Sequence, residues 1–212
     1  MLERLFSEYD ASLLTLLRKL IKEIGIGTDG KQDEGFDSYR TALDLVGLKS
    51  LSEETAGILR YYLGSAISLN SLKTISDEAV AALAKYRGHI DLEGIRSLSE
   101  KALHAFTNHQ DRFSYNGLSL GISQLEDSTA DILANFKSHK IFLPKLKRIS
   151  ASAAINLSKY KGEIYLTGLK QLSLTAARCL ASHHGTLTLG RACDLSDEAA
   201  VAIRYHPHLQ WR

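Results

Sequence analysis

The residues best suited to chemistry in this sequence are two cysteines and two neighbouring histidines. Cys179 precedes His183 and His184 by four and five residues, which is helical spacing, and Cys193 follows them. Thiolate and imidazole groups bind zinc, and a cysteine beside a histidine can serve as a nucleophile. An enzyme or a metal-dependent sensor that uses these four side chains is therefore one alternative for the function.

Other signatures of catalysis are missing from the sequence. It contains no P-loop, no GxGxxG and no HExxH motif, and the glycine-rich stretch at residues 25–30 lacks the lysine of a phosphate loop. Neither oxyanion donors nor a third orienting residue can be assigned beside Cys179 and His183. We therefore predict a non-enzymatic protein with no catalytic residues, no metal site and no cofactor.

The elements that would position these side chains belong to a repeat. Residues 89–106, HIDLEGIRSLSEKALHAF, contain a short strand, a turn at Gly94, a buried return and a short amphipathic helix. The same order recurs at intervals of 23 or 24 residues, with one interval of 28. The first strand positions of the units are Leu43, Ile67, Ile90, Leu118, Ile141, Ile164 and Leu187. We therefore predict about seven units of 23 residues between residues 42 and 212.

The third strand position is leucine in every unit. These leucines are Leu45, Leu69, Leu92, Leu120, Leu143, Leu166 and Leu189. A unit of this length cannot bury its own apolar face, whereas stacked units can, because equivalent leucines then form continuous ladders. Stacking predicts a parallel sheet with the leucines on its buried side.

A serine precedes the helix of nearly every unit and is expected to cap it. The serines are Ser52, Ser76, Ser99, Ser150, Ser173 and Ser196, whereas the fourth unit carries Glu126 and Asp127 near this place. An aromatic residue or a histidine follows each helix, as Tyr86, Tyr160 and His183 do, so His183 fits the repeat without a metal. Gly64, Gly88, Gly162 and Gly185 come two residues later and suggest left-handed helix ends.

The combined order of residues identifies a resemblance to a known family. The pattern L-x-L-x-x-(L/I)-x-x-(L/I)-S-(D/E)-x-A-x-x-x-L-A, over residues 42–206, resembles a leucine-rich repeat. ISDEAVAALA and LSDEAAVAI are most similar to the helical, cysteine-containing subclass of F-box-associated receptors and many bacterial proteins. Leucine, isoleucine or alanine replaces the cysteine of that subclass, which favours a bacterial-type variant.

This resemblance implies both a fold and a function. The fold is an α/β, right-handed leucine-rich-repeat solenoid, with the parallel sheet on the concave face and the helices on the convex face. The function is protein–protein recognition through the concave sheet, with no catalytic residues to transfer from the family.

Residues 1–41 form a predicted N-terminal capping helix and loop, separate from the repeat domain at 42–212. Apolar residues within 3–24 have helical spacing, and residues 25–38 contain four glycines. The alternative is a substrate-receptor or effector subunit in which this helix docks a larger complex. At the other end, Leu209 and Trp211 predict a last partial strand that covers the core.

The predicted binding surface consists of strand residues that alternate with the buried ones. Asp44, Asp91 and Glu93 make its N-terminal half acidic. Its C-terminal half carries Phe142 beside Tyr165, which should touch because neighbouring strands lie about 4.8 Å apart.

Lysines and one inserted loop complete this surface. Lys140 and Lys145 flank the aromatic pair. The long interval before Leu118 places Phe113 and Tyr115 in an insertion, and insertions in solenoids are frequent contact sites. We expect Tyr115 to contribute to a recognition loop, with packing of Phe113 against the core as the alternative.

Composition limits the partner and the compartment. The 212 residues carry a formal net charge of +2 and no long basic run, which argues against nucleic acid and anionic membranes. No stretch of about 20 apolar residues is present, so no membrane span is predicted. With two cysteines and no signal-peptide pattern, the expected location is cytoplasmic, with a secreted effector as the alternative. We expect a monomer that binds a protein partner.

Overall fold

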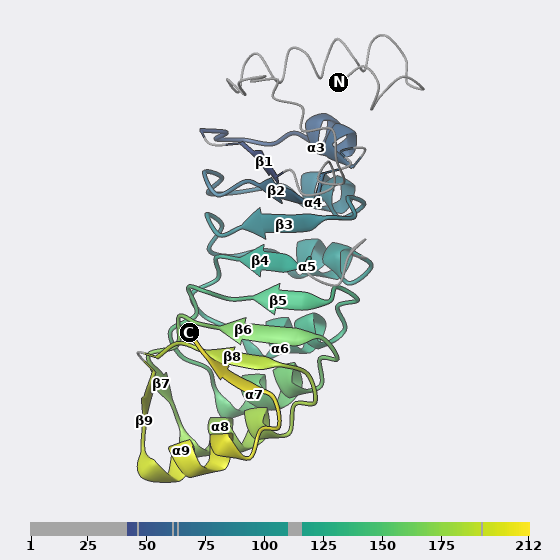
Figure 1. The fold of residues 1–212 in the computed structure, drawn as a ribbon. Coiled ribbons are helices and arrows are strands. Elements are labelled where there is room, and N and C mark those ends of the chain that lie inside the picture. Colours follow the sequence, from purple (N-terminus) through teal and green to yellow (C-terminus); the bar gives the residue numbers. More distant parts are fainter. Residues whose placement is uncertain (1–41, 46, 61, 63, 110–115, 192) are drawn as a thin grey trace, which may run out of the picture.

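The computed structural model describes residues 42–45, 47–60, 62, 64–109, 116–191 and 193–212. Within them, short strands alternate with short helices, and eight strands form one parallel sheet in the order β1-β2-β3-β4-β5-β6-β8-β10 (Figure 1). Each unit therefore adds its strand beside that of the unit before it. The predicted capping helix and loop at 1–41, like Tyr115 in the insertion, lie outside the described residues.

The bounds of the elements follow the predicted repeat. The strands of the main sheet are β1 (Ala42–Asp44), β2 (Ala66–Ser68), β3 (His89–Leu92), β4 (Leu118–Leu120), β5 (Lys140–Phe142), β6 (Glu163–Leu166), β8 (Leu187–Leu189) and β10 (Leu209–Trp211). The helices are α3 (Glu53–Leu59), α4 (Asp77–Leu83), α5 (Glu100–Phe106), α6 (Asp127–Ala134), α7 (Ala151–Ser158), α8 (Leu174–Ala181) and α9 (Asp197–Arg204). Two further strands, β7 (Gln171–Leu172) and β9 (Asp194–Leu195), pair with each other in a small second sheet that the repeat pattern did not predict.

The register of the sheet confirms the predicted phase of the repeat. Leu43 pairs with Ile67, Ile67 with Ile90, and so on through Ile164 with Leu187, without a slip. The third-position leucines from Leu45 to Leu189 are all between 0% and 1% exposed. A slip of one residue would have turned all of these leucines to the opposite face of the sheet.

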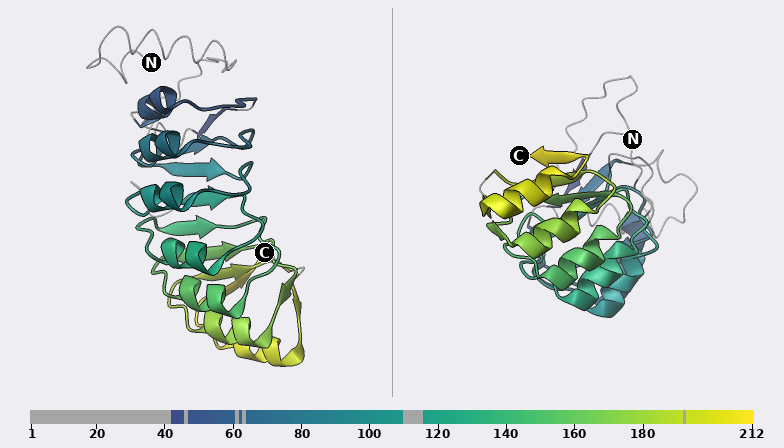
Figure 2. Two further views of the ribbon diagram at one scale, coloured as in Figure 1. Left: turned by 180° about the vertical axis from the view of Figure 1, so that it is seen from behind. Right: turned by 90° about the horizontal axis from the view of Figure 1, so that it is seen from below.

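The described helices form a second layer on one face of the sheet (Figures 1 and 2). Each helix contacts the next along the stack, from α3 with α4 to α8 with α9. The six predicted serines all act as caps, because each side chain accepts a hydrogen bond from the main-chain N–H three residues later. Glu126 stands at the cap of α6 and makes no such side-chain bond.

Buried aromatic rings and histidines follow the helices, as the repeat pattern predicts. Tyr86, Tyr160 and His183 are 1%, 2% and 1% exposed. The glycine that comes two residues after each of them has a different role from the one predicted. Gly88, Gly162 and Gly185 do not adopt a positive φ angle, so the prediction of left-handed helix ends is wrong for them. A Cβ at these glycines would instead overlap the tip of the preceding ring or a carbonyl of the unit before.

The last strand, β10, confirms the predicted C-terminal strand. Leu209 pairs with Leu187 and Trp211 with Leu189. Trp211 remains 39% exposed, so it covers the end of the core only in part.

Candidate binding surface on the open face of the sheet

The open face of the sheet is the face opposite the helices. Side chains alternate along a strand, so the residues on either side of the buried leucines point to this face. The register places one residue of every strand in a single row across the open face. The row consists of Asp44, Ser68, Asp91, Ser119, Phe142, Tyr165, Thr188 and Gln210. Four of the predicted contact residues therefore lie in line.

An aromatic stack occupies the centre of the C-terminal half. The rings of Phe142 and Tyr165 lie with their centroids 4.3 Å apart and their planes 20° apart, which confirms the predicted contact. Phe142 is half-buried. Tyr165 is only 7% exposed, which corrects the expectation that both rings are open to solvent.

Neighbouring side chains explain the burial of Tyr165. The Lys140 ammonium lies 5.9 Å and the Arg212 guanidinium 5.5 Å from the centroid of its ring. Its hydroxyl donates to a carboxylate oxygen of Glu163 at 2.7 Å. Burial raises the pKa of Tyr165 to about 12, and the hydrogen bond and negative charge of Glu163 act in the same direction. The Tyr165 side chain is therefore uncharged and held in place, with its ring stacked against that of Phe142.

Phe142 also contacts a strand that is not its neighbour. The ring of His89, on β3, meets Phe142, on β5, edge to face with centroids 5.4 Å apart. The strand between them, β4, carries only Ser119 in the row, with Gly117 just before the strand. Because these side chains are small, the larger rings on both sides meet above them. His89, Phe142 and Tyr165 form what we call the aromatic row.

Both predicted lysines have partners within the protein. Lys140 forms an ion pair with Glu163 at 3.2 Å, and its side chain is only 17% exposed. Lys145 reaches across the β4 unit and donates to the main-chain oxygen of Glu93. The acidic and basic halves therefore meet at Glu93 rather than lying apart as the sequence suggested.

On the acidic side, hydrogen bonds fix two of the three carboxylates. Asp91 accepts from the side-chain amide of Asn70 at 2.5 Å, and Glu93 accepts from the Ser119 hydroxyl at 3.1 Å. Asp44 is exposed on the edge strand β1. This network fixes the orientation of the Asp91 and Glu93 carboxylates.

The cysteine and histidine cluster is not assembled as a metal site. Within the described part of the chain, no three His, Cys, Asp or Glu side chains are grouped to hold a metal ion. Cys179 and Cys193 are free and half-buried. Burial, and then the charge of Asp194, raise the pKa of the Cys193 thiol, which favours the unreactive protonated form. His183 lies in the buried ring ladder that the repeat predicted.

Three residues of this surface were not singled out by sequence reasoning: His89, Glu163 and Arg212. Their places in the repeat are the signal that would have found them, because His89 and Glu163 stand in strands, Arg212 directly follows β10, and all three continue the alternation of the predicted contacts. What the alternation does not reveal is which long side chains fold over Tyr165.

No helix among the described residues is both long and apolar enough to cross a lipid bilayer. The sequence matches no protein-family model and no curated protein.

Proposed function

We propose that this chain is a leucine-rich repeat protein that binds a protein partner through the open face of its sheet, without catalysis. The unbroken register, the stacked units and the capped helices support the repeat assignment. Because parallel strands joined by helical crossovers are almost always connected in the right-handed sense, the proposed solenoid is right-handed, with its open sheet face concave. The helical, cysteine-containing subclass remains the proposed relative.

The aromatic row carries this proposal. Binding energy at protein interfaces concentrates in a few large side chains, aromatic ones among them, that are well packed and become desolvated. Phe142 is wedged between His89 and Tyr165 and is still half-exposed. A ring that is already fixed loses little conformational entropy when a partner covers it, so more of its contact energy contributes to affinity.

The polar surroundings favour a partner of defined shape and mixed charge. Lys140 and Glu163 form an ion pair beside the aromatic row, and Asp91, Glu93 and Lys145 are held in place by hydrogen bonds elsewhere on the open face. Charges held in place tune orientation and association rate more than affinity. We therefore propose an apolar anchor on the partner that covers Phe142, with polar contacts around it.

Affinity capture with the full chain tests this function. The wild type and the Phe142→Ala variant are compared with Ile155→Ala, a matched control because Ile155 is an apolar residue 49% exposed on the helix side. A protein captured by the wild type and by the control, but lost with Phe142→Ala, is the expected result. If Phe142→Ala captures the same proteins in the same amounts, the open face is not the binding surface.

A further inference from the structure

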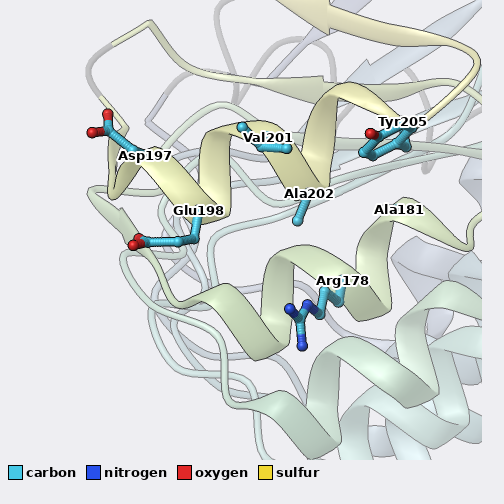
Figure 3. A pocket seen from close by; sticks show the side chains of 7 residues that line it. All are labelled: Arg178, Ala181, Asp197, Glu198, Val201, Ala202 and Tyr205. Carbon is cyan, nitrogen blue, oxygen red and sulfur yellow. The ribbon is translucent and has the colours of Figure 1, made fainter.

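An apolar patch lies on the other side of the molecule, where the last two helices meet. Ala181 of α8, Val201 of α9 and Tyr205, the residue just after α9, line a shallow hollow of about 560 Å³, with Arg178, Asp197 and Glu198 at its borders (Figure 3). Val201 is 51% and Tyr205 80% exposed. We call these six residues the α9 patch.

The repeat itself shows that this patch is unusual. Val201 is the fifth residue after the helix cap, where α4, α5, α6 and α8 carry Ala81, His104, Asp131 and Arg178. Tyr205 is the ninth, where the units of α4 to α8 carry Lys85, Asn108, Asn135, Lys159 and Ser182. The unit of α7 also has an apolar residue at the fifth position, Ile155, but it carries the charged Lys159 at the ninth. Among the units of α4 to α9, only the last is apolar at both places.

The charges around the patch are complementary to one another. Arg178 stands on α8 and Glu198 on α9, with the hollow between them (Figure 3). Neither of them, nor Asp197, forms an ion pair with another described residue. In a twofold-symmetric dimer, a contact between one residue of the first copy and a different residue of the second copy always forms twice, with the roles of the two copies exchanged. Arg178 of one copy can then face Glu198 of the second copy on both sides of an apolar centre.

We propose that two copies of this chain associate through their α9 patches in a symmetric dimer. Val201 and Tyr205 from both copies form the apolar centre, and two Arg178–Glu198 pairs flank it. The dimer replaces the monomer expected from the sequence, and it leaves the open sheet face of each copy available. A contact of two short helices per copy is small, so the association belongs to the weak end of specific interfaces.

Sedimentation velocity of the full chain over a wide concentration range tests the dimer. The wild type is expected to pass from monomer to dimer as concentration rises. Val201→Asp and Tyr205→Ala should each raise the dissociation constant by about 30-fold, the effect of removing an interface anchor. Ile155→Asp is the matched control and should leave the dimer unchanged, because it alters the same helix position in α7. Circular dichroism verifies that each variant is folded.

Charge reversal tests the symmetric pairing. Arg178→Glu and Glu198→Arg should each weaken the dimer, more so at low salt, and the double variant should bring the dissociation constant back toward the wild-type value. Several results would overturn the proposal: a wild type that stays monomeric at the highest concentration, a dimer indifferent to Val201→Asp, a double variant without recovery, or assembly beyond the dimer. The first two would leave the patch to another occupant, such as the segment 1–41 or a different protein, and the third would rule out the symmetric Arg178–Glu198 pairing.

Discussion

The hydroxyl of Tyr86 donates a hydrogen bond to the main-chain carbonyl of Gly64, one unit upstream, with 2.7 Å between the oxygens. Tyr160 makes the equivalent bond to the carbonyl of Ser138 at 2.5 Å. Both rings are almost completely buried. These bonds tie the end of one helix to the preceding unit inside the core.

Removing the Tyr86 hydroxyl should therefore destabilise the stack. Tyr86→Phe leaves the Gly64 carbonyl buried without this donor, and we expect a loss of about 1 to 3 kcal/mol in unfolding free energy. Urea denaturation measures the loss. Tyr205→Phe is the control, because that tyrosine is 80% exposed and its change should stay within about 0.5 kcal/mol. Equal stability of Tyr86→Phe and the wild type would show that the bond contributes nothing.

Two histidines occupy the same place as these tyrosines and lead to a pH dependence. His183 and His206 are 1% and 3% exposed, and the Nε2 atom of each has no hydrogen-bond partner among the described residues. Burial lowers the pKa of His206 from 6.5 to about 4, and the neighbouring His183 and His208 add to the shift. Burial also lowers the pKa of His183.

The sign of the pH effect follows from these pKa values. Between pH 6.5 and about pH 4 the unfolded chain binds a proton at His206 that the folded protein does not, so stability should fall as the pH falls through this window. Above pH 6.5 the histidine should contribute no pH dependence. In the unit of α6 the equivalent position is Phe136, so phenylalanine fits this place in the repeat. The variant His206→Phe should therefore lose less unfolding free energy than the wild type as the pH is lowered. Denaturation of both proteins at several pH values gives the comparison, and parallel curves would refute the assignment.

The serine caps should differ in strength in a predictable way. Ser150 caps α7 and also donates to Asp127 of the preceding unit at 2.9 Å, whereas the Ser173 side chain makes only its cap bond within α8 among the described residues. Ser173→Ala should cost about 1 kcal/mol and Ser150→Ala up to about 2 kcal/mol. Glu126→Ala should cost less than either, since Glu126 makes no side-chain cap bond. Thermal unfolding ranks the three, and the reverse order would contradict the cap geometry.

Two glycines should respond to alanine in opposite directions. A Cβ on Gly168 would overlap the main-chain carbonyl of Pro144 in the neighbouring unit. At Gly57 in α3, by contrast, no atom of the described residues comes within 4 Å of an added Cβ, apart from the backbone of the helix itself and the two chain neighbours. Gly168→Ala should cost about 1 to 3 kcal/mol through overpacking. Gly57→Ala should stabilise the helix by up to about 1 kcal/mol. Chemical denaturation distinguishes the signs, and a neutral Gly168→Ala would mean that the units separate easily.

Most of the fold was predictable because the same pattern of apolar and capping residues recurs in nearly every unit. Leucine recurs at the third strand position in seven units, so strand phase and register followed from spacing alone. Serine before six of the described helices predicted their caps for a local reason, because its hydroxyl can accept a hydrogen bond from a main-chain N–H of the first turn in any unit. The glycines such as Gly88 were misread because their cause is tertiary, namely a ring tip where a Cβ would lie.

The residues on the open face of the sheet were predictable, but the contacts among them were not. Alternation placed Phe142 and Tyr165 on the open face, yet Tyr165 is covered by Lys140 and Arg212. Alternation also gave no hint that Lys145 would cross the β4 unit to reach Glu93. A long side chain can reach several neighbours in the folded protein. Which neighbour it contacts depends on the residues between them, such as the small Ser119. The proposed role of Tyr115 falls outside the described residues.

Photo-crosslinking from position 142 tests the central claim most directly. A benzophenone amino acid replaces Phe142 in one protein and Ile155 in another, and both are irradiated with the proteins that the wild type captures. We predict a protein adduct from position 142, on the open face, and none from position 155, on the helix side. Adducts from position 155 alone would contradict recognition through the sheet.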